Sequence, residues 1–473
     1  MSLAPSADSR ANPVRHLRQV LLWPLRLLRQ PGSEAGPPWQ VLRDLGPSCP
    51  WQEVVDEYTG DAGRFHERHY NEFVTFLPFV QRFLFGEGRS GRDCDDGSGG
   101  APMRVFRRRD VAAARVVTRA GAAPLTLKLV HVDLYFFFDV DVVLLNLELE
   151  IDELPLAIAQ DLMYRLGRAY PPGWDAAGEP MHCLAGAEFL DAQGRVLAAS
   201  DARQRDAFLA HVAEHRAPRI AAHWAWLLQP LVPDHSPEQA PLRYRQIEYH
   251  RMPMMAYLAL DEPGALSRND FVRLGLVTGA SDGAAADLPY AQRHLDDFEA
   301  RYCYDRFWTS VGAAPDTRYL CSGHSLVVVG RADAQFFRCG ERGVLAQFRH
   351  QHFMVFMIVH LQKAALLMFS DRLVEALKSL NVRSAPSVKR FKRAIRHSFE
   401  GFLRFTHRYW FREISDQAQT RALFRLASAH LQLEPLYAEV KERIADMNAY
   451  LDADSLRRQA NTVVRLTVVT IFG

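Results

Sequence analysis

The sequence lacks closely spaced cysteine pairs and an excess of charge of either sign. Its six cysteines are widely separated and form no Cys-x-x-Cys pair, which favours reduced thiols in a cytosolic compartment over a disulfide framework or a zinc knuckle. There are 57 Lys and Arg against 55 Asp and Glu, so the whole-chain charge indicates neither a nucleic-acid wrapper nor a scavenger of acidic ligands. Any electrostatic function must therefore be local.

Neither end of the chain contains an apolar run of the ~20 residues that a transmembrane helix requires. Residues 16–30 (HLRQVLLWPLRLLRQ) carry leucines at near-helical spacing between arginines, but Pro24 interrupts them and the run is too short to span. A signal peptide would need an uninterrupted apolar stretch and a small-residue cleavage site. We therefore expect an amphipathic helix here, either packed on the domain or lying on a membrane surface.

The remaining composition is that of a large globular protein. With 473 residues, of which 48% are hydrophobic, the chain should form more than one structural unit, because cores stop growing near ~250–300 residues. A stretch rich in Gly, Ser and Asp predicts a flexible loop at 86–101. We expect a helical region at 1–100 that includes this loop, an α/β cytosolic domain at 101–335, long antiparallel helices at 336–433 and a stalk helix at 434–473.

The middle of the chain has the pattern of a β-sheet. Residues 125–151 are dense in Val, Leu and Phe and alternate with period two at both ends, which predicts two long strands. The fold class is therefore α+β, with a mixed β-sheet flanked by helices and followed by long C-terminal helices that form a funnel or stalk. Further strands are predicted at 187–190, 195–199, 244–250, 255–260 and 325–330, with helices at 154–170 and 202–214.

The last third of the chain is predicted to be helical throughout. Residues 342–380 would place apolar side chains on most faces of a helix, and residues 388–411 are strongly basic. The final tract begins with Pro435, where a missing N–H costs nothing, and would reach about 60 Å at ~1.5 Å per residue. Such a length suits a stalk better than a compact domain.

The composition of the final tract changes along its length. Its first part is charged, and Arg457, Arg458 and Arg465 then precede the apolar segment LTVVTIFG. Cations followed by an apolar run without a terminal cap are typical of the cytosolic entrance to a membrane span, so these arginines are predicted to lie at the membrane interface. A short apolar helix docked on its own domain is the alternative.

Residues 460–473 (ANTVVRLTVVTIFG) resemble the stalk-to-membrane junction of CorA-type divalent metal transporters. The order of the predicted units is also similar to that family, in which a cytosolic α/β domain is followed by two helices that fold back and by a stalk helix entering the first of two spans. The resemblance implies a homopentamer anchored in the inner (plasma) membrane through its C-terminal helix, with this region on the cytoplasmic side. It implies a divalent cation, expected to be Mg²⁺, as the transported or regulatory ion, with no organic cofactor, no nucleic-acid partner and no enzymatic activity.

The resemblance also points to individual residues. Val463, Leu466 and Thr470 lie one helical turn apart and would face the fivefold axis, where an apolar ring can close a pore by dewetting. A lipid-facing or core stripe has the same spacing. In the family, cytosolic carboxylates between subunits bind metal and hold the pore shut. The stalk residues that match these by location are Asp446, Asp452 and Asp454, which would otherwise be ordinary solvated carboxylates.

Two other functions remain open. A metal-dependent phosphoryl-transfer enzyme is possible because polar residues alternate along the two long predicted strands, and paired carboxylates on a sheet can hold Mg²⁺. No Gly-rich phosphate loop accompanies them, and a solvent-facing side of a sheet has the same pattern. A membrane-tethered sensor or scaffold without a pore is the second alternative. The alternating residues are His131, Asp133, Asp139, Asp141, Glu148, Glu150 and Asp152.

Two features of the C-terminal helices have both structural and functional interpretations. The histidines His350, His352 and His360 lack the i, i+4 pairing of zinc-binding helices, so we expect structural roles. The basic segment 383–412 contains the single acidic residue Glu400 and interleaved aromatic residues. Such a segment can contact nucleic acid or anionic lipid, whereas the helical stripe of its aromatics favours a packed helix with a charged outer face.

Overall fold

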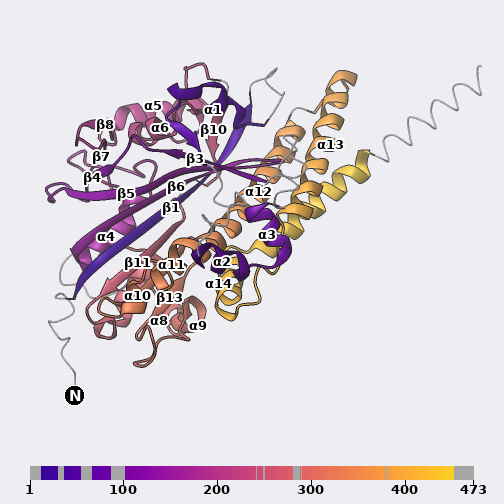
Figure 1. Ribbon diagram of the computed structural model, residues 1–473. Coiled ribbons are helices and arrows are strands. Elements are labelled where there is room, and N and C mark those ends of the chain that lie inside the picture. The colour runs from indigo at the N-terminus through magenta and orange to yellow at the C-terminus, as the bar shows by residue number, and fades with distance from the viewer. Residues whose placement is uncertain are drawn as a thin grey trace, which may run out of the picture.

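A large β-sheet and a layer of long helices form the protein, which confirms the predicted α+β class with long C-terminal helices (Figure 1). The computed structural model describes residues 12–29, 37–54, 67–86, 102–240, 242–248, 251–280, 288, 290–378, 380–381 and 383–451. The predicted loop beyond residue 86 and the predicted stalk beyond residue 451 lie outside these ranges.

In the part of the chain that is described, fourteen strands form one mixed sheet. The main path runs in the order β12-β13-β14-β11-β1-β6-β5-β4-β7-β8, with only the β11–β14 pair parallel along it. The strands are β1 (Pro13–Arg29), β2 (Trp51–Glu53), β3 (Met103–Arg108), β4 (Ala113–Val117), β5 (Leu125–Phe137), β6 (Val140–Pro155), β7 (Gly186–Leu190), β8 (Val196–Ala199), β9 (Val232–Pro233), β10 (Leu242–Gln246), β11 (Met254–Leu260), β12 (Cys303–Tyr304), β13 (Arg318–Cys321) and β14 (Ser325–Arg331).

The predicted central strands are confirmed by β5 and β6, and the shorter predictions correspond to β7, β8, β10, β11 and β14. Helices lie between the strands and after them. They are α1 (Gln40–Asp44), α2 (Glu67–Thr75), α3 (Pro78–Phe85), α4 (Leu156–Leu166), α5 (Arg205–His215), α6 (Ala222–Leu228), α7 (Arg268–Leu276), α8 (Gln292–Leu295), α9 (Phe298–Tyr302), α10 (Gln335–Arg338), α11 (Val344–Gln347), the π-turn η6 (Phe348–His352), α12 (Phe353–Lys378), α13 (Ala385–Arg408), α14 (Ala418–His430) and a helix over 433–451.

Strand β1 shows that the helix predicted for residues 16–30 is wrong, both as a packed helix and as a membrane-surface helix. The strand pairs with β6 along one edge and with β11 and then β10 along the other, so the N-terminal region belongs to the sheet and not to a separate helical unit. The leucine spacing of four suits a helix, but it is also a multiple of the strand period of two. Pro24 lies in the gap between the β11 and β10 pairings, an irregular position that tolerates proline.

The two faces of β1 pack into different cores. Leu17, Leu21 and Leu25 are buried in the core that includes α4 and α6, whereas Val20 and Leu22 are buried in the core that includes α12. The same alternation continues in β6, so both strands are covered on both sides. A central strand of this kind requires an apolar residue at nearly every position, which explains why its sequence resembles a buried helix.

The helix layer contains the predicted long helices. Residues Val344–Lys378 run without interruption through α11, η6 and α12, and α13 folds back beside α12 to form a helical hairpin. By length and composition this stretch could cross a membrane, the one described helix that could. However, 72% of its most apolar window is buried inside the protein, as in the core helix of a soluble domain. Helix 433–451 then runs along the hairpin, with Val440 and Ile444 in the shared core (Figure 1).

Acid pH should destabilise the protein through histidines that are buried without charge. His352 in η6 is 2% exposed, and burial lowers its pKa from 6.5 to about 4. In the unfolded chain the pKa of His352 returns to about 6.5. Between about pH 6.5 and pH 4 the unfolded chain therefore binds a proton at His352 that the folded chain does not, and the free energy of unfolding falls as the pH decreases through this range.

On acidification from about pH 7.5 to about pH 5, the free energy of unfolding should fall by about 2 kcal/mol more in the wild type than in His352→Phe. Urea denaturation of both proteins at each pH measures this difference. The phenylalanine keeps the packing against Tyr319, whose ring lies edge-on to His352. An identical pH dependence in the two proteins would contradict the assignment of His352 as a neutral core residue.

Candidate functional site

Most residues that the sequence assigned to a pore or a membrane interface fall outside the described part of the chain. These are Val463, Leu466, Thr470, Arg457, Arg458 and Arg465, together with the carboxylates Asp452 and Asp454. The remaining predicted metal ligand, Asp446, is exposed on helix 433–451, and Glu442 is exposed one turn before it. Both carboxylates therefore face solvent on the same helix.

The alternating carboxylates are buried or half-buried except for the exposed Asp152, and they form no metal cluster. Asp133 and Glu148 are 1% and 5% exposed, and no group of three or more His, Cys, Asp or Glu among the described residues is arranged to hold a metal ion. Basic side chains pair with the carboxylates instead. The pairs are Asp133 with Arg107, Asp139 with Arg404 and Arg408, Asp141 with Arg372, Glu148 with Arg18 and Arg349, Glu150 with Arg18 and Lys128, and Asp152 with His16.

Glu148 is the centre of a buried ionic group between the sheet and the helix layer. Its Oε1 accepts hydrogen bonds from Arg18 Nη1 on β1 at 2.7 Å and from Arg349 Nε on η6 at 3.2 Å. His131 Nε2 on β5 lies 3.7 Å from Glu148 Oε2, but burial lowers the pKa of His131, which favours the neutral ring. We call Arg18, His131, Glu148 and Arg349 the interlayer network.

The π-turn η6 positions the outer member of this network. A π-turn inserts an extra residue into a helix and redirects the side chains around it. Arg349 consequently reaches the sheet, while the next residue, His350, points to Glu72 on α2 with a 2.9 Å separation between Nδ1 and Oε1. The same turn therefore contacts the sheet and α2.

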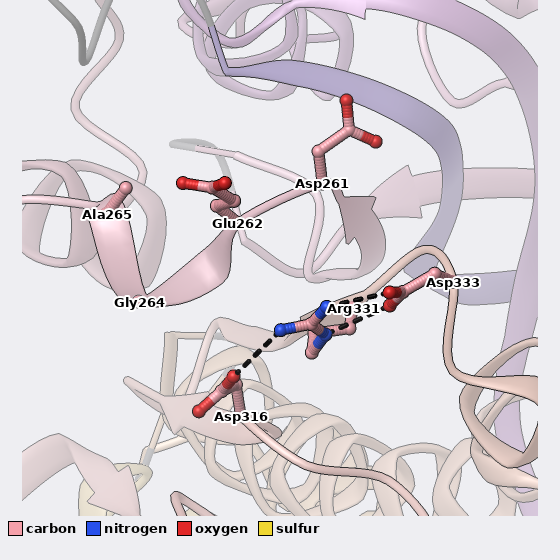
Figure 2. A pocket seen from close by; sticks show the side chains of 7 residues that line it. All are labelled: Asp261, Glu262, Gly264, Ala265, Asp316, Arg331 and Asp333. Atoms are coloured by element: carbon pink, nitrogen blue, oxygen red, sulfur yellow. Dashed lines mark hydrogen bonds and ion pairs between the residues drawn. The ribbon is translucent and has the colours of Figure 1, made fainter. Parts of the chain in front are cut away.

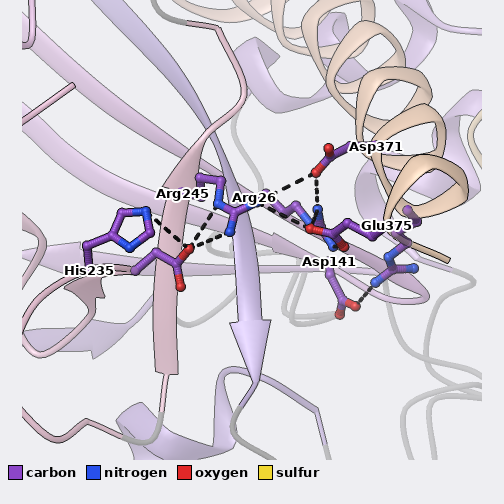
Figure 3. Close-up of polar contacts among 8 residues, drawn as sticks. Arg26, Asp141, His235, Arg245, Asp371 and Glu375 are labelled. Atoms are coloured by element: carbon purple, nitrogen blue, oxygen red, sulfur yellow. Dashed lines mark hydrogen bonds and ion pairs between the residues drawn. The ribbon is translucent and has the colours of Figure 1, made fainter. Parts of the chain in front are cut away.

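A second ionic group joins the sheet to the far part of α12 (Figure 3). Arg26 on β1 donates from Nη2 to Glu375 Oε2 at 2.7 Å and also bonds Asp371, which lies one turn earlier on α12. Arg245 on β10 donates to Glu375 at 3.3 Å and to Asp234 at 2.5 Å. We call Arg26, Arg245, Asp371 and Glu375 the hairpin clamp.

The positive charges of Arg26 and Arg245 keep Glu375 of the hairpin clamp ionised. Burial raises the pKa of Glu375, but the hydrogen bond and charge of Arg26 and the charge of Arg245 outweigh this effect, so the pKa of Glu375 is lowered. Arg26 itself is only 7% exposed. Breaking one side of the clamp would therefore leave a charge in a largely desolvated position.

A third contact lies at the turn between β5 and β6. Asp139 has a φ of 62°, a left-handed conformation that Asp tolerates better than most residues. Its carboxylate accepts from Arg408 at 2.6 Å and from Arg404 at 3.4 Å, both on α13. Tyr409 also donates its hydroxyl to the carbonyl oxygen of Phe138 at 2.6 Å. The end of α13 is thus fixed to the tip of the strand pair.

The arginines of these groups were missed in the sequence, although a signal for them exists. Arg18 and Arg26 are eight residues apart in β1, an even number, and therefore share one face of a strand. Once β1 is recognised as a strand, this spacing places two cations on the face opposite Leu17, Leu21 and Leu25. Cations on an otherwise buried face predict carboxylate partners in the layer above.

A cavity of about 500 Å³ lies elsewhere, beyond the end of β11 (Figure 2). Arg331 lies between two of its carboxylates, 2.7 Å from Asp333 and 3.8 Å from Asp316. A third, Asp261, is held by Arg15 at 2.6 Å. Cations therefore already neutralise three of the acidic groups in this cavity, and it does not form a metal-binding cluster.

Comparison of the chain with protein-family models, with curated proteins and with solved structures found no match. The geometry of the described residues shows a sheet fastened to a helical hairpin at three places. One of these fastenings, the hairpin clamp, includes α12, and Arg372 of α12 also pairs with Asp141 on β6. Helix 433–451 packs on α12 as well. The site is therefore suited to holding helices in position relative to the sheet.

Removing the central carboxylate of the interlayer network should destabilise the protein strongly. Glu148→Ala leaves Arg349 unpaired and Arg18 with only Glu150, so we expect the free energy of unfolding to fall by about 3 kcal/mol, as for a broken buried ion pair. The control is Lys128→Ala, which removes the 72% exposed partner of Glu150, the other carboxylate that Arg18 binds, and should cost less than about 1 kcal/mol. Urea denaturation near neutral pH compares them, and equal losses would refute a structural role for the network.

Proposed function

We propose that this chain is the cytosolic regulatory region of a CorA-like divalent cation channel, with Mg²⁺ as the expected ion and no catalytic activity. The observation that carries the proposal is the path of helix 433–451. This helix packs along the α12–α13 hairpin and leads into residues 460–473, the tract that resembles the stalk-to-membrane junction of that family. A sheet domain, a folded-back helix pair and a returning helix follow one another in the order that the resemblance implies.

The packing of helix 433–451 supports a mechanical role. Tyr437 stacks on Trp410 with ring centroids 4.3 Å apart and an interplanar angle of 11°, and it also stacks on Phe402. Further along, Arg443 donates to the hydroxyl of Ser370 on α12 at 3.0 Å. Because the hairpin clamp ties α12 to the sheet, a displacement of the sheet would move the returning helix as well.

The exposed carboxylates of the same helix support regulation by the transported ion. Glu442 and Asp446 offer the hard oxygen ligands that Mg²⁺ prefers, and bound between copies of the chain the ion would favour the closed arrangement. At low Mg²⁺ these carboxylates would repel one another, and the helices would separate. The proposal thereby links ion concentration to the opening of the pore.

The decisive experiment measures ion flux through the natural full-length gene product in liposomes that contain a Mg²⁺-sensitive dye. We expect Mg²⁺ entry and a higher basal rate in Leu466→Ser, because a polar ring stays hydrated and no longer blocks ions by dewetting. Val468→Ser is the control, since two residues further along a helix the side chain points to nearly the opposite side. Insertion of the wild type without any flux would overturn the channel and favour a membrane-tethered sensor.

A second measurement tests the regulatory carboxylates. In the same liposomes, Glu442→Gln with Asp446→Asn should abolish the inhibition of flux by Mg²⁺ on the cytosolic side, because the amides bind the cation poorly. Glu434→Gln is the control, because this carboxylate on the same helix pairs with Arg412 at 3.1 Å. Unchanged inhibition in the double variant would refute the assigned metal ligands while leaving the channel itself standing.

A further inference from the structure

Positive charge is concentrated around the turn between α12 and α13. From residue 376 to residue 399 the sequence contains no Asp or Glu. We call the cations of this segment the basic tip, and they are Lys378, Arg383, Lys389, Arg390, Lys392, Arg393 and Arg396. Seven cations without an acidic residue form a strongly positive end on a chain whose total charge is nearly balanced.

One face of α13 packs into the core and the opposite face presents the cations. Val388, Phe391 and Ile395 are buried against the helix layer, whereas Lys389, Arg390, Arg393 and Arg396 are exposed. Within the described ranges no carboxylate lies within ion-pair distance of these four cations. The other end of α13 differs, because Arg404 and Arg408 are paired with Asp139. Uncompensated charge is therefore confined to the half of α13 next to the turn.

Exposed apolar side chains accompany this charge. Val374 and Leu377, on the last turns of α12, are 41% and 46% exposed. Cations beside exposed aliphatic groups are the combination that anionic membrane surfaces bind, because the cations contact phosphates while the aliphatic groups enter the headgroup region. A surface for single-stranded nucleic acid needs exposed aromatic rings, but Phe391, Phe402 and Phe405 of α13 are buried.

We propose that the basic tip binds the headgroups of anionic phospholipids in the cytosolic leaflet of the membrane. In Figure 1 the end of the α12–α13 hairpin that contains the turn projects beyond the sheet, and helix 433–451 runs towards that same end. The location of the membrane on that side rests on the proposed function. Three other parts of the argument are independent of the proposed function: the charge, the exposed aliphatic groups and the choice of lipid over nucleic acid.

The test uses the 473-residue chain and sedimentation with vesicles of phosphatidylcholine, with or without phosphatidylglycerol. We expect tighter binding when the anionic lipid is present, and weaker binding as salt increases. Arg390→Gln with Arg393→Gln should reduce the affinity for the anionic vesicles by about 25-fold, roughly fivefold for each cation removed. Binding to the neutral vesicles should be the same in variant and wild type, since phosphatidylcholine carries no net charge that would attract the arginines.

The matched control is Arg205→Gln with Arg216→Gln, which removes two exposed cations from α5 and its end and should leave vesicle binding unchanged. Equal affinity of the α13 variant and the wild type for anionic vesicles would overturn the proposal. So would tighter binding of the wild type to a single-stranded oligonucleotide than to those vesicles. Circular dichroism of each variant, expected to match the wild type, verifies that the fold is intact.

The vesicle experiment and the flux experiment fail independently. Lipid binding that depends on Arg390 and Arg393, in a full-length protein that passes no ions, supports the basic tip and rejects the channel. Flux that is the same in neutral and anionic liposomes, together with vesicle binding that the α13 variant does not weaken, rejects the basic tip and retains the channel.

Discussion

Two arginines on β1 determine how the helix layer fits on the sheet. Arg18 and Arg26 are each 7% exposed, and a guanidinium at that depth is tolerated only with carboxylates in reach. For Arg18 these carboxylates come from β6, and for Arg26 they come from Asp371 and Glu375 on α12. A helix shifted along the sheet by one turn would leave Arg26 without one of its two partners. The ionic contacts therefore specify the register of α12, whereas apolar contacts alone would allow it to slide.

The success of the strand predictions depended on residue type. The segments that became β5 and β6 are rich in Val, Leu and Phe, and their length and alternation exclude a helix, so they were recognised. Strand β1 is built from Leu and Arg, which are good helix formers, and its leucines are spaced by four. Its identity comes from pairing with β6 and β11, whose residues lie more than a hundred positions away in the chain. Such tertiary contacts override local preference and are not visible in a short window of sequence.

The candidate site was harder to predict for the same reason. The acidic residues of β5 and β6 were noticed, but their meaning depends on partners such as Arg18 for Glu148, which is 130 residues away. A carboxylate beside a metal and a carboxylate beside an arginine have the same sequence pattern. By contrast, the structural role expected for His352 and His360 needed only their spacing along one helix and no distant partner. Their burial is consistent with that expectation.

The positions of the ionic contacts along the hairpin divide it into a held part and a free part. The interlayer network holds its beginning, the hairpin clamp holds α12 as far as Glu375, and Asp139 holds the end of α13. The half of α13 next to the turn extends past these contacts, and it carries the exposed cations Lys389, Arg390, Arg393 and Arg396. A membrane contact at the basic tip would thus act on a short helical segment that Arg26 ties to the sheet through Asp371 and Glu375. Helix 433–451 packs on the same hairpin, so lipid binding, sheet position and the returning helix would be linked through α12.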